Sequence, residues 1–187
     1  MTMKQHDGLN YVEDPFVPIA IPPQAPAREG KAQVGKIQLW YWDTGGDGEP
    51  IVLVHPASGS GLIWGYQQPV FAKAGYRAIG YSRRGHYQSS PIDEHDPGTG
   101  AADLNALVDH LGLEKFHLLG CAAGGGVAAD YAFSHQDRLL TLIVSSNSVG
   151  QRSGYIADHA ARVRPKEWEG LPVWFRELSP GYRGANA

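Results

Sequence analysis

One short stretch of the chain combines the residue types and the spacing of a reactive corner. The segment Gly120-Cys121-Ala122-Ala123-Gly124 contains only small residues and follows an apolar run that begins at Lys115. Small residues let a strand turn sharply into a helix. In a corner of the pattern Gly-x-Nu-x-Gly, where Nu is a nucleophile, the third side chain lies at the carboxyl edge of a parallel sheet. A nucleophile at that position would attack a carbonyl carbon. Here the position holds Ala122, whose methyl group cannot attack.

Two other glycine-rich sites fit this stretch less well. A dinucleotide fingerprint requires Gly-x-Gly-x-x-Gly, but residue 122 is alanine where the second glycine belongs. A phosphate loop requires lysine and then serine or threonine after Gly125, whereas Gly126 and Val127 follow. Phosphate binding is therefore not favoured for this corner.

The apolar pattern around the corner predicts strands that alternate with helices. Strands are expected at 32–44, 50–55, 76–81, 115–120 and 139–144, and helices at 63–73, 100–111 and after residue 123. Such alternation is typical of a parallel sheet that carries helices on both faces. We expect an α/β protein with three α/β/α layers and a mostly parallel central sheet.

The chain divides into three parts by composition. Residues 1–31 are rich in proline and are expected to form an extended arm, either a disordered leader or a segment packed on the domain; apolar residues in it favour the second interpretation. Residues 32–150 carry the predicted core. Residues 151–187 carry an aromatic-rich apolar pattern and are expected to begin a cap or lid.

Three motifs carry a resemblance to a known family. Val54-His55-Pro56-Ala57-Ser58-Gly59 resembles a His-Gly-x oxyanion loop, and Tyr81 to Ser89 resembles the pattern Tyr-Asp-x-Arg-Gly-His-Gly-x-Ser. The third motif is the corner at 120–124. In this order and spacing the three resemble the α/β-hydrolase family over residues 34 to 150, with the corner as its nucleophile elbow.

The resemblance implies a site for ester, lactone or similar carbonyl compounds. Family members use a nucleophile, a histidine base, an acid and two backbone N–H groups that hold the oxyanion. Ala122 would occupy the nucleophile position, and Ala57 and Ala123 would supply the two N–H groups. Pro56 departs from the pattern, because it stands where the family has glycine. An apolar or aromatic ligand would be contacted by side chains near the elbow and in the cap: Ser58, Trp64, Cys121, Trp168 and Trp174.

Three explanations of Ala122 remain open. The alanine replaces a serine, or it is natural in a protein that binds a ligand or works without a covalent step, or Cys121 is the nucleophile. The last is disfavoured, since shifting the frame by one puts Leu119 where a small residue is needed. The alternative to a hydrolase is therefore a non-catalytic small-molecule-binding protein on the same fold.

The catalytic acid and base of the family follow later strands, which this chain is expected to lack. We expect a companion polypeptide to supply these strands; a truncated chain would instead leave the sheet with an exposed edge. His55 and His86 are expected to hydrogen-bond their own loops, and Asp103 is expected to be solvated or to cap a helix.

Composition excludes several other classes of function. The net charge is −3 and no run of lysine and arginine exceeds two residues, so nucleic acid is not expected as a partner. No His, Cys or Asp cluster has metal-ligand spacing, and no cofactor is expected. The chain has one cysteine, no long apolar span and no apolar signal core, which predicts a cytoplasmic protein without membrane contact.

Overall fold

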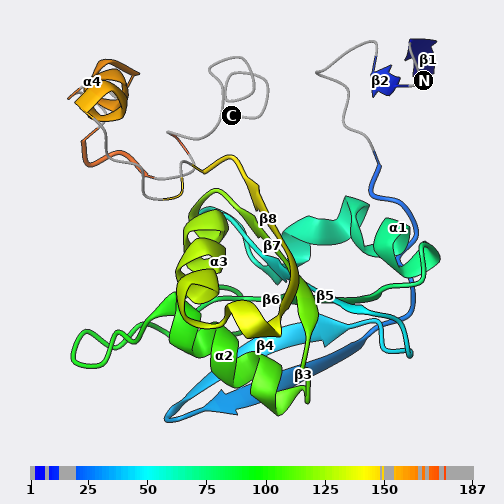
Figure 1. Ribbon diagram of the computed structural model, residues 1–187. Coiled ribbons are helices and arrows are strands. Elements are labelled where there is room, and N and C mark those ends of the chain that lie inside the picture. The colour runs from blue at the N-terminus through cyan, green and yellow to red at the C-terminus, as the bar shows by residue number, and fades with distance from the viewer. Residues whose placement is uncertain are drawn as a thin grey trace.

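The computed structural model describes residues 3–6, 9–12, 20–147, 149, 154–163, 166, 169–172 and 175. Its centre is a six-stranded sheet with the strand order β3-β4-β6-β5-β7-β8 (Figure 1). The strands are β3 (Arg28–Val34), β4 (Ile37–Asp43), β5 (Pro50–Val54), β6 (Arg77–Tyr81), β7 (Phe116–Cys121) and β8 (Leu139–Ser145). Strands β6, β5, β7 and β8 are parallel, and β3 and β4 pair antiparallel at one side. The predicted mostly parallel sheet is confirmed.

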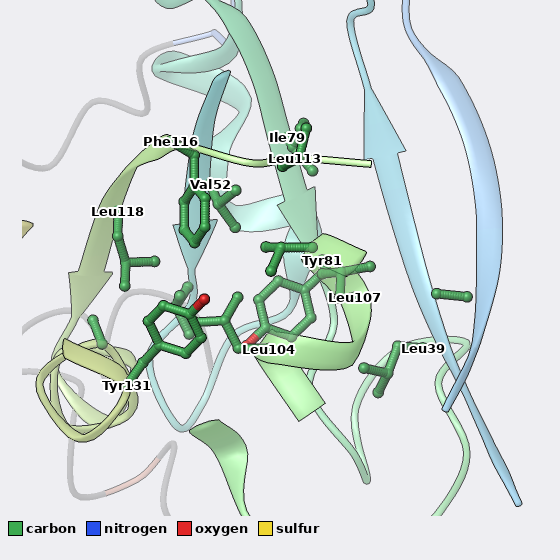
Figure 2. Packing of buried hydrophobic residues seen from close by; sticks show 14 residues of the cluster. Leu39, Val52, Ile79, Tyr81, Leu104, Leu107, Leu113, Phe116, Leu118 and Tyr131 are labelled. Carbon is green, nitrogen blue, oxygen red and sulfur yellow. The ribbon is translucent and has the colours of Figure 1, made fainter. Parts of the chain in front are cut away.

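Helices cover both faces of this sheet, which gives the predicted three layers. Helices α2 (Gly100–His110) and α3 (Ala123–Ser134) pack on one face, and the 3-10 helix η1 (Gly61–Tyr66) with α1 (Gln68–Lys73) packs on the other. On the α2 and α3 side, Leu104, Leu107 and Tyr131 meet strand residues such as Val52 and Leu118 (Figure 2). Burying such side chains stabilises the fold by about 1.5–3 kcal/mol each.

Two predicted elements are divided in the structure. The strand expected at 32–44 is two antiparallel strands, because the chain reverses at Gly35, where φ is +56°, and Val34 pairs with Ile37. The helix expected at 63–73 is η1 followed by α1. Pro69 lies in the first turn of α1, and its ring nitrogen cannot donate to an earlier carbonyl group, so the preceding helix stops before it.

The N-terminal segment contains more structure than an extended arm. Strand β1 (Met3–His6) pairs antiparallel with β2 (Leu9–Val12), and β3 begins at Arg28, inside the stretch predicted as the arm. Residue Ala25 is held on the domain by both ends of the Gln68 side-chain amide: Oε1 accepts from Ala25 N at 2.9 Å and Nε2 donates to Ala25 O at 2.8 Å. This part of the arm is therefore packed against the domain.

Strand β8 forms one edge of the sheet and exposes apolar side chains. Leu140, Leu142 and Ile143 are 39%, 41% and 45% exposed, and within the described residues β8 pairs only with β7. Strand β5, by contrast, is buried from Ile51 to Val54. A strand as apolar as β8 is normally covered on both faces.

Beyond β8 the described residues are few. They include the helix α4 (Gly154–Val163), while Trp168 and Trp174 lie outside the described residues. No helix in the described part of the chain is long and apolar enough to cross a membrane.

Candidate active site

The corner between β7 and α3 has the backbone conformation that its glycines predict. Strand β7 ends at Cys121, α3 begins at Ala123, and Ala122 lies between them with φ 48° and ψ −116°. An alanine rarely adopts a positive φ, and such a residue costs of order 1–3 kcal/mol. Ala122 is thus at the tip of a strained turn and outside the regular helix.

Hydrogen bonds to both backbone groups of Ala122 hold this strained conformation. Its N–H donates to the carbonyl oxygen of Ser145 at 2.9 Å. Its carbonyl oxygen accepts from Gly125 N at 2.9 Å and from Asn147 Nδ2 at 2.7 Å. The end of β8 therefore fixes the tip of the elbow.

The elbow packs directly against the end of β5, which places it beside the loop that follows. A Cβ atom on Gly124 would collide with the carbonyl oxygens of Val54 and His55, and a Cβ atom on Gly120 would collide with the carbonyl group of Gly124. Only glycine permits this approach. The first turn of α3 and the start of the loop at 56–61 are consequently neighbours.

The Pro56 carbonyl group fixes the direction of the next N–H group. Its oxygen lies 2.6 Å from His55 Nδ1, 3.1 Å from Arg83 Nη2 and 3.3 Å from Gly59 N. In a trans peptide the following N–H points opposite to the carbonyl oxygen, so the N–H of Ala57 points away from these three donors. No acceptor in the described part of the chain takes that N–H.

The N–H of Ala123 is also available to a ligand. Ala123 is the first residue of α3, and the first N–H groups of a helix have no partner within the helix. The helix dipole adds partial positive charge at this end. Within the residues that the structure describes, neither of the two N–H groups predicted to hold an oxyanion has an acceptor.

The two motif histidines hydrogen-bond their loops, as predicted. The Nε2 atom of His55 accepts from Arg83 N at 3.0 Å, so the ring is neutral and its Nδ1–H donates to Pro56 O. Burial lowers the pKa of His55 to about 3. The His86 ring lies 4.6 Å from that of His55, with Nε2 3.0 Å from Ala57 O and Nδ1 2.8 Å from Arg84 O.

These contacts leave neither histidine free to act as a base. Both ring nitrogens of His55 and of His86 face backbone groups. His117 bonds Thr141 and Glu49, and these residues lie on the strands and loop remote from the elbow end of β7. None of these three histidines is therefore placed for proton transfer at the elbow.

The predicted ligand contacts lie in different places. Ala57 and Ser58 are exposed on the loop, and Cys121 is half-buried directly before the elbow tip. Trp64 is only 7% exposed and packs with Trp40 and Trp42 under the arm, where it borders a cavity of about 270 Å³. Contact of these residues with a ligand stays a prediction.

Two residues that support the site were not singled out from the sequence. Arg83 fixes the Pro56 carbonyl group and Asn147 fixes that of Ala122. Arg83 lies inside the second motif, which is a signal that could have found it. Asn147 follows the last strand, and only the parallel pairing of β7 with β8 brings it to the elbow.

The geometry of the elbow and loop agrees with comparisons to known proteins. A family profile described as "alpha/beta hydrolase fold" matches residues 49–179. The chain belongs to the α/β hydrolase fold family. Within this family, the non-heme chloroperoxidase CPO-A1 of Kitasatospora aureofaciens is 38% identical over 100 residues, which is 53% of this chain and 36% of that protein. The proline iminopeptidase of Arabidopsis thaliana is 25% identical over 187 residues, which is 96% of this chain and 47% of that protein.

Solved structures of α/β hydrolases are similar in fold. A bromoperoxidase from Bacillus anthracis has a TM-score of 0.57 at 36% identity and covers 63% of this chain and 44% of its own. A structure from work on carboxylesterases of Nitrososphaera gargenis has a TM-score of 0.61 at 27% identity and covers 73% of this chain and 52% of its own. This α/β hydrolase chain spans about half the length of its relatives or less.

Proposed function

We propose that this chain provides the carbonyl-binding part of an α/β hydrolase site for an ester, lactone or similar carbonyl compound with an apolar acyl or aromatic part. The observation that carries the proposal is the pair of N–H groups of Ala57 and Ala123, which lie beside a strained turn and have no acceptor among the described residues. Such N–H groups stabilise the negative charge that develops on a carbonyl oxygen during acyl transfer, and removing one costs about 10²–10³ in turnover.

The retained strain supports this proposal. A turn with a positive φ at a residue other than glycine destabilises the fold, and such conformations cluster at functional sites. The glycines at 120 and 124 add a second cost, because they lower the stability of a strand and a helix. A corner that served only to connect β7 to α3 would need neither.

The methyl group of Ala122 favours a second candidate function. Without a nucleophilic atom at the tip, no acyl-enzyme can form on residue 122, and losing such a nucleophile typically costs about 10⁶-fold in turnover. The chain would then bind a carbonyl compound without cleaving it. A hydrolase in which alanine replaces serine and a natural binding protein would share all other features of the site.

The Ala122→Ser variant separates the two candidates. We expect the variant to release p-nitrophenol from a short-chain p-nitrophenyl ester at least 10³-fold faster than the unchanged chain, if the remaining catalytic groups are present. Ser134→Ala, at the far end of α3, is the matched control and leaves the rate unchanged. Ester binding by both chains without turnover by the variant would favour the binding protein, and no ester binding by either chain would contradict both proposals.

We also propose that a companion polypeptide completes the sheet along β8 and carries the catalytic acid and histidine. The proposal is supported by the exposed apolar side chains of β8 and by the contacts of the two motif histidines, which hydrogen-bond backbone groups and are not placed to act as the base. The chain also spans less than half the length of the curated relatives described above. A parallel strand from the companion would pair with β8 and cover Leu142 and Ile143.

Native mass spectrometry of the purified protein tests the companion. We expect a 1:1 complex whose second chain contains a histidine and an aspartate required for activity of the Ala122→Ser variant. The Ile143→Lys substitution, which places a charge on the β8 face, should dissociate the complex, whereas Phe133→Lys on the surface of α3 should not. A monomer, or a complex of two copies of this chain, would contradict the proposal.

A further inference from the structure

The cavity beside Trp64 lies between the N-terminal arm and the sheet. Its volume is about 270 Å³, and it is lined by residues of the arm, β3, β4, η1 and α1, among them Gln24, Glu29, Trp40, Trp42, Trp64 and Gln68. Gln24 Nε2 donates to Gly65 O at 2.7 Å, and the Gln68 amide holds Ala25. The wall that the arm contributes is therefore fixed to the domain.

The indole N–H groups of the three tryptophans are not available to a ligand in this cavity. Trp42 Nε1 donates to Gly61 O at 2.7 Å, and Trp40 Nε1 donates to Glu29 Oε2 at 3.1 Å. Trp64 Nε1 is buried and has no partner among the described residues. These side chains therefore offer a ligand only their rings, whose faces carry negative partial charge.

The amide side chains of the wall have no free N–H group either. Gln68 uses both Oε1 and Nε2 on Ala25, and Gln24 Nε2 donates to Pro22 O and to Gly65 O, each at 2.7 Å. Among the described residues that line the cavity, none is lysine, arginine or histidine. Side chains that could attract an anion are thus missing from this wall.

Glu29 gives the same wall a negative charge. Its Oε2 accepts from Trp40 Nε1, while Oε1 has no hydrogen bond and the carboxylate has no ion pair within the described part of the chain. Lys31 lies two residues further along β3 and does not pair with it. A carboxylate attracts a cation directly, and the rings of neighbouring tryptophans attract it through their quadrupoles.

We propose that this cavity binds a small organic cation with a methylated ammonium group, whose charge lies near Glu29 and whose methyl groups contact the indole rings. Sites for drug-sized ligands have volumes of about 300–1,000 Å³, so a cavity of about 270 Å³ fits a smaller molecule. A primary ammonium has three N–H groups to satisfy, whereas the side chains of the wall offer two free oxygens, those of Glu29 and Gln24. Methyl groups on the nitrogen need no acceptor.

Titration with choline chloride tests the proposal, with the alcohol in which a carbon atom replaces the choline nitrogen as the uncharged isostere. Both are added at low ionic strength to the purified protein, with any polypeptide that binds it, and the assigned indole N–H signals are followed by ¹H–¹⁵N NMR. We expect choline to shift the signals of Trp40 and Trp42 until they saturate, and the isostere to bind at least about tenfold more weakly. Equal affinity for the two compounds, or saturation by neither, would overturn the proposal.

The Glu29→Gln variant isolates the contribution of the charge. Glutamine keeps a side-chain oxygen that can accept from Trp40 Nε1 and removes the carboxylate, so we expect choline to bind at least about fivefold more weakly. Glu94→Gln, which removes an exposed carboxylate in the loop after β6, is the matched control and should leave the affinity unchanged. Equal affinities of the two variants would overturn the proposal. These measurements need no turnover, so their outcome is separate from that of the proposed carbonyl chemistry.

Discussion

The side-chain amide of Asn147 donates from Nδ2 to the backbone carbonyl oxygen of Ala122 at 2.7 Å. The same side chain accepts from Val149 N through Oδ1 at 2.6 Å. A residue just beyond β8 thereby joins the tip of the elbow to the chain that leads away from the sheet. The conformation of the elbow depends on β8 as much as on the glycines within it.

Removing that side chain should loosen the elbow. We expect Asn147→Ala to lower the free energy of unfolding by about 1–2 kcal/mol, because the hydrogen bond to the Ala122 carbonyl oxygen and the one from Val149 N are both lost. We also expect faster hydrogen exchange at Gly125 and Gly126, whose N–H groups bond the same oxygen. Gln136→Ala, which removes an exposed amide, is the control; equal effects of the two changes would contradict this assignment.

Replacing Ala122 with glycine should stabilise the protein despite the added freedom of the unfolded chain. Glycine adopts the positive φ of this residue without strain, so we expect a net gain of about 1 kcal/mol in urea denaturation. Ala106→Gly, in the middle of α2, should lower the free energy of unfolding by about 1 kcal/mol, because glycine has a lower helix propensity than alanine. Loss of stability in both variants would show that residue 122 is not strained.

Two glycines of α3 should respond in opposite ways to a methyl group. Gly124→Ala should unfold the protein or cost more than about 3 kcal/mol, because the methyl group collides with the carbonyl groups at the end of β5. Gly126→Ala should gain about 0.5–1 kcal/mol, since the nearest atom is Asn147 Nδ2 at 3.7 Å and alanine favours the helix. Thermal unfolding followed by circular dichroism measures both, and tolerance of alanine at 124 would contradict the close packing.

Acid should destabilise the fold through His55. Burial lowers the pKa of His55 to about 3, from 6.5 in the unfolded chain, so the unfolded state binds more protons between these values. The contribution of His55 to the free energy of unfolding is fully present above pH 6.5 and is lost as the pH falls toward 3. At pH 5 the loss relative to pH 8 is about 2 kcal/mol.

The His55→Asn variant isolates this contribution. We expect the stability difference between the unchanged chain and His55→Asn, measured by urea denaturation at several pH values, to shrink by about 2 kcal/mol between pH 8 and pH 5. Comparing the two chains cancels the contribution of every group that they share. A difference that stays constant with pH would show that His55 titrates normally in the folded protein.

Local pattern was enough to predict the elements that build the site. The conformations of β5 and of the elbow are determined by neighbouring residues, namely an apolar run and closely spaced glycines. The predicted strand, turn and helix were therefore confirmed there. The turn at Gly35 was missed although the apolar positions change phase there, from Ala32 and Val34 to Ile37 and Leu39; the positive φ of Gly35 and the pairing of Val34 with Ile37 show the reversal. The break in the predicted helix near Pro69 was missed although proline is a local signal.

Local patterns do not predict contacts between residues that are far apart in the sequence. Asp103 was expected to be solvated or to cap a helix, but it is 4% exposed and pairs with Arg84 from another loop. The expectation was wrong because the partner lies outside the helix that carries Asp103. The Arg83 contact with Pro56 is of the same kind.

The two edges of the sheet differ in a way that has a consequence for assembly. Strand β3 carries the charged residues Arg28, Glu29 and Lys31, which discourage a further strand, while β8 carries no charge and several uncovered aliphatic side chains. The charges on β3 disfavour a further strand at that edge. We therefore expect a strand that extends the sheet to pair with β8, on the side on which the elbow is anchored.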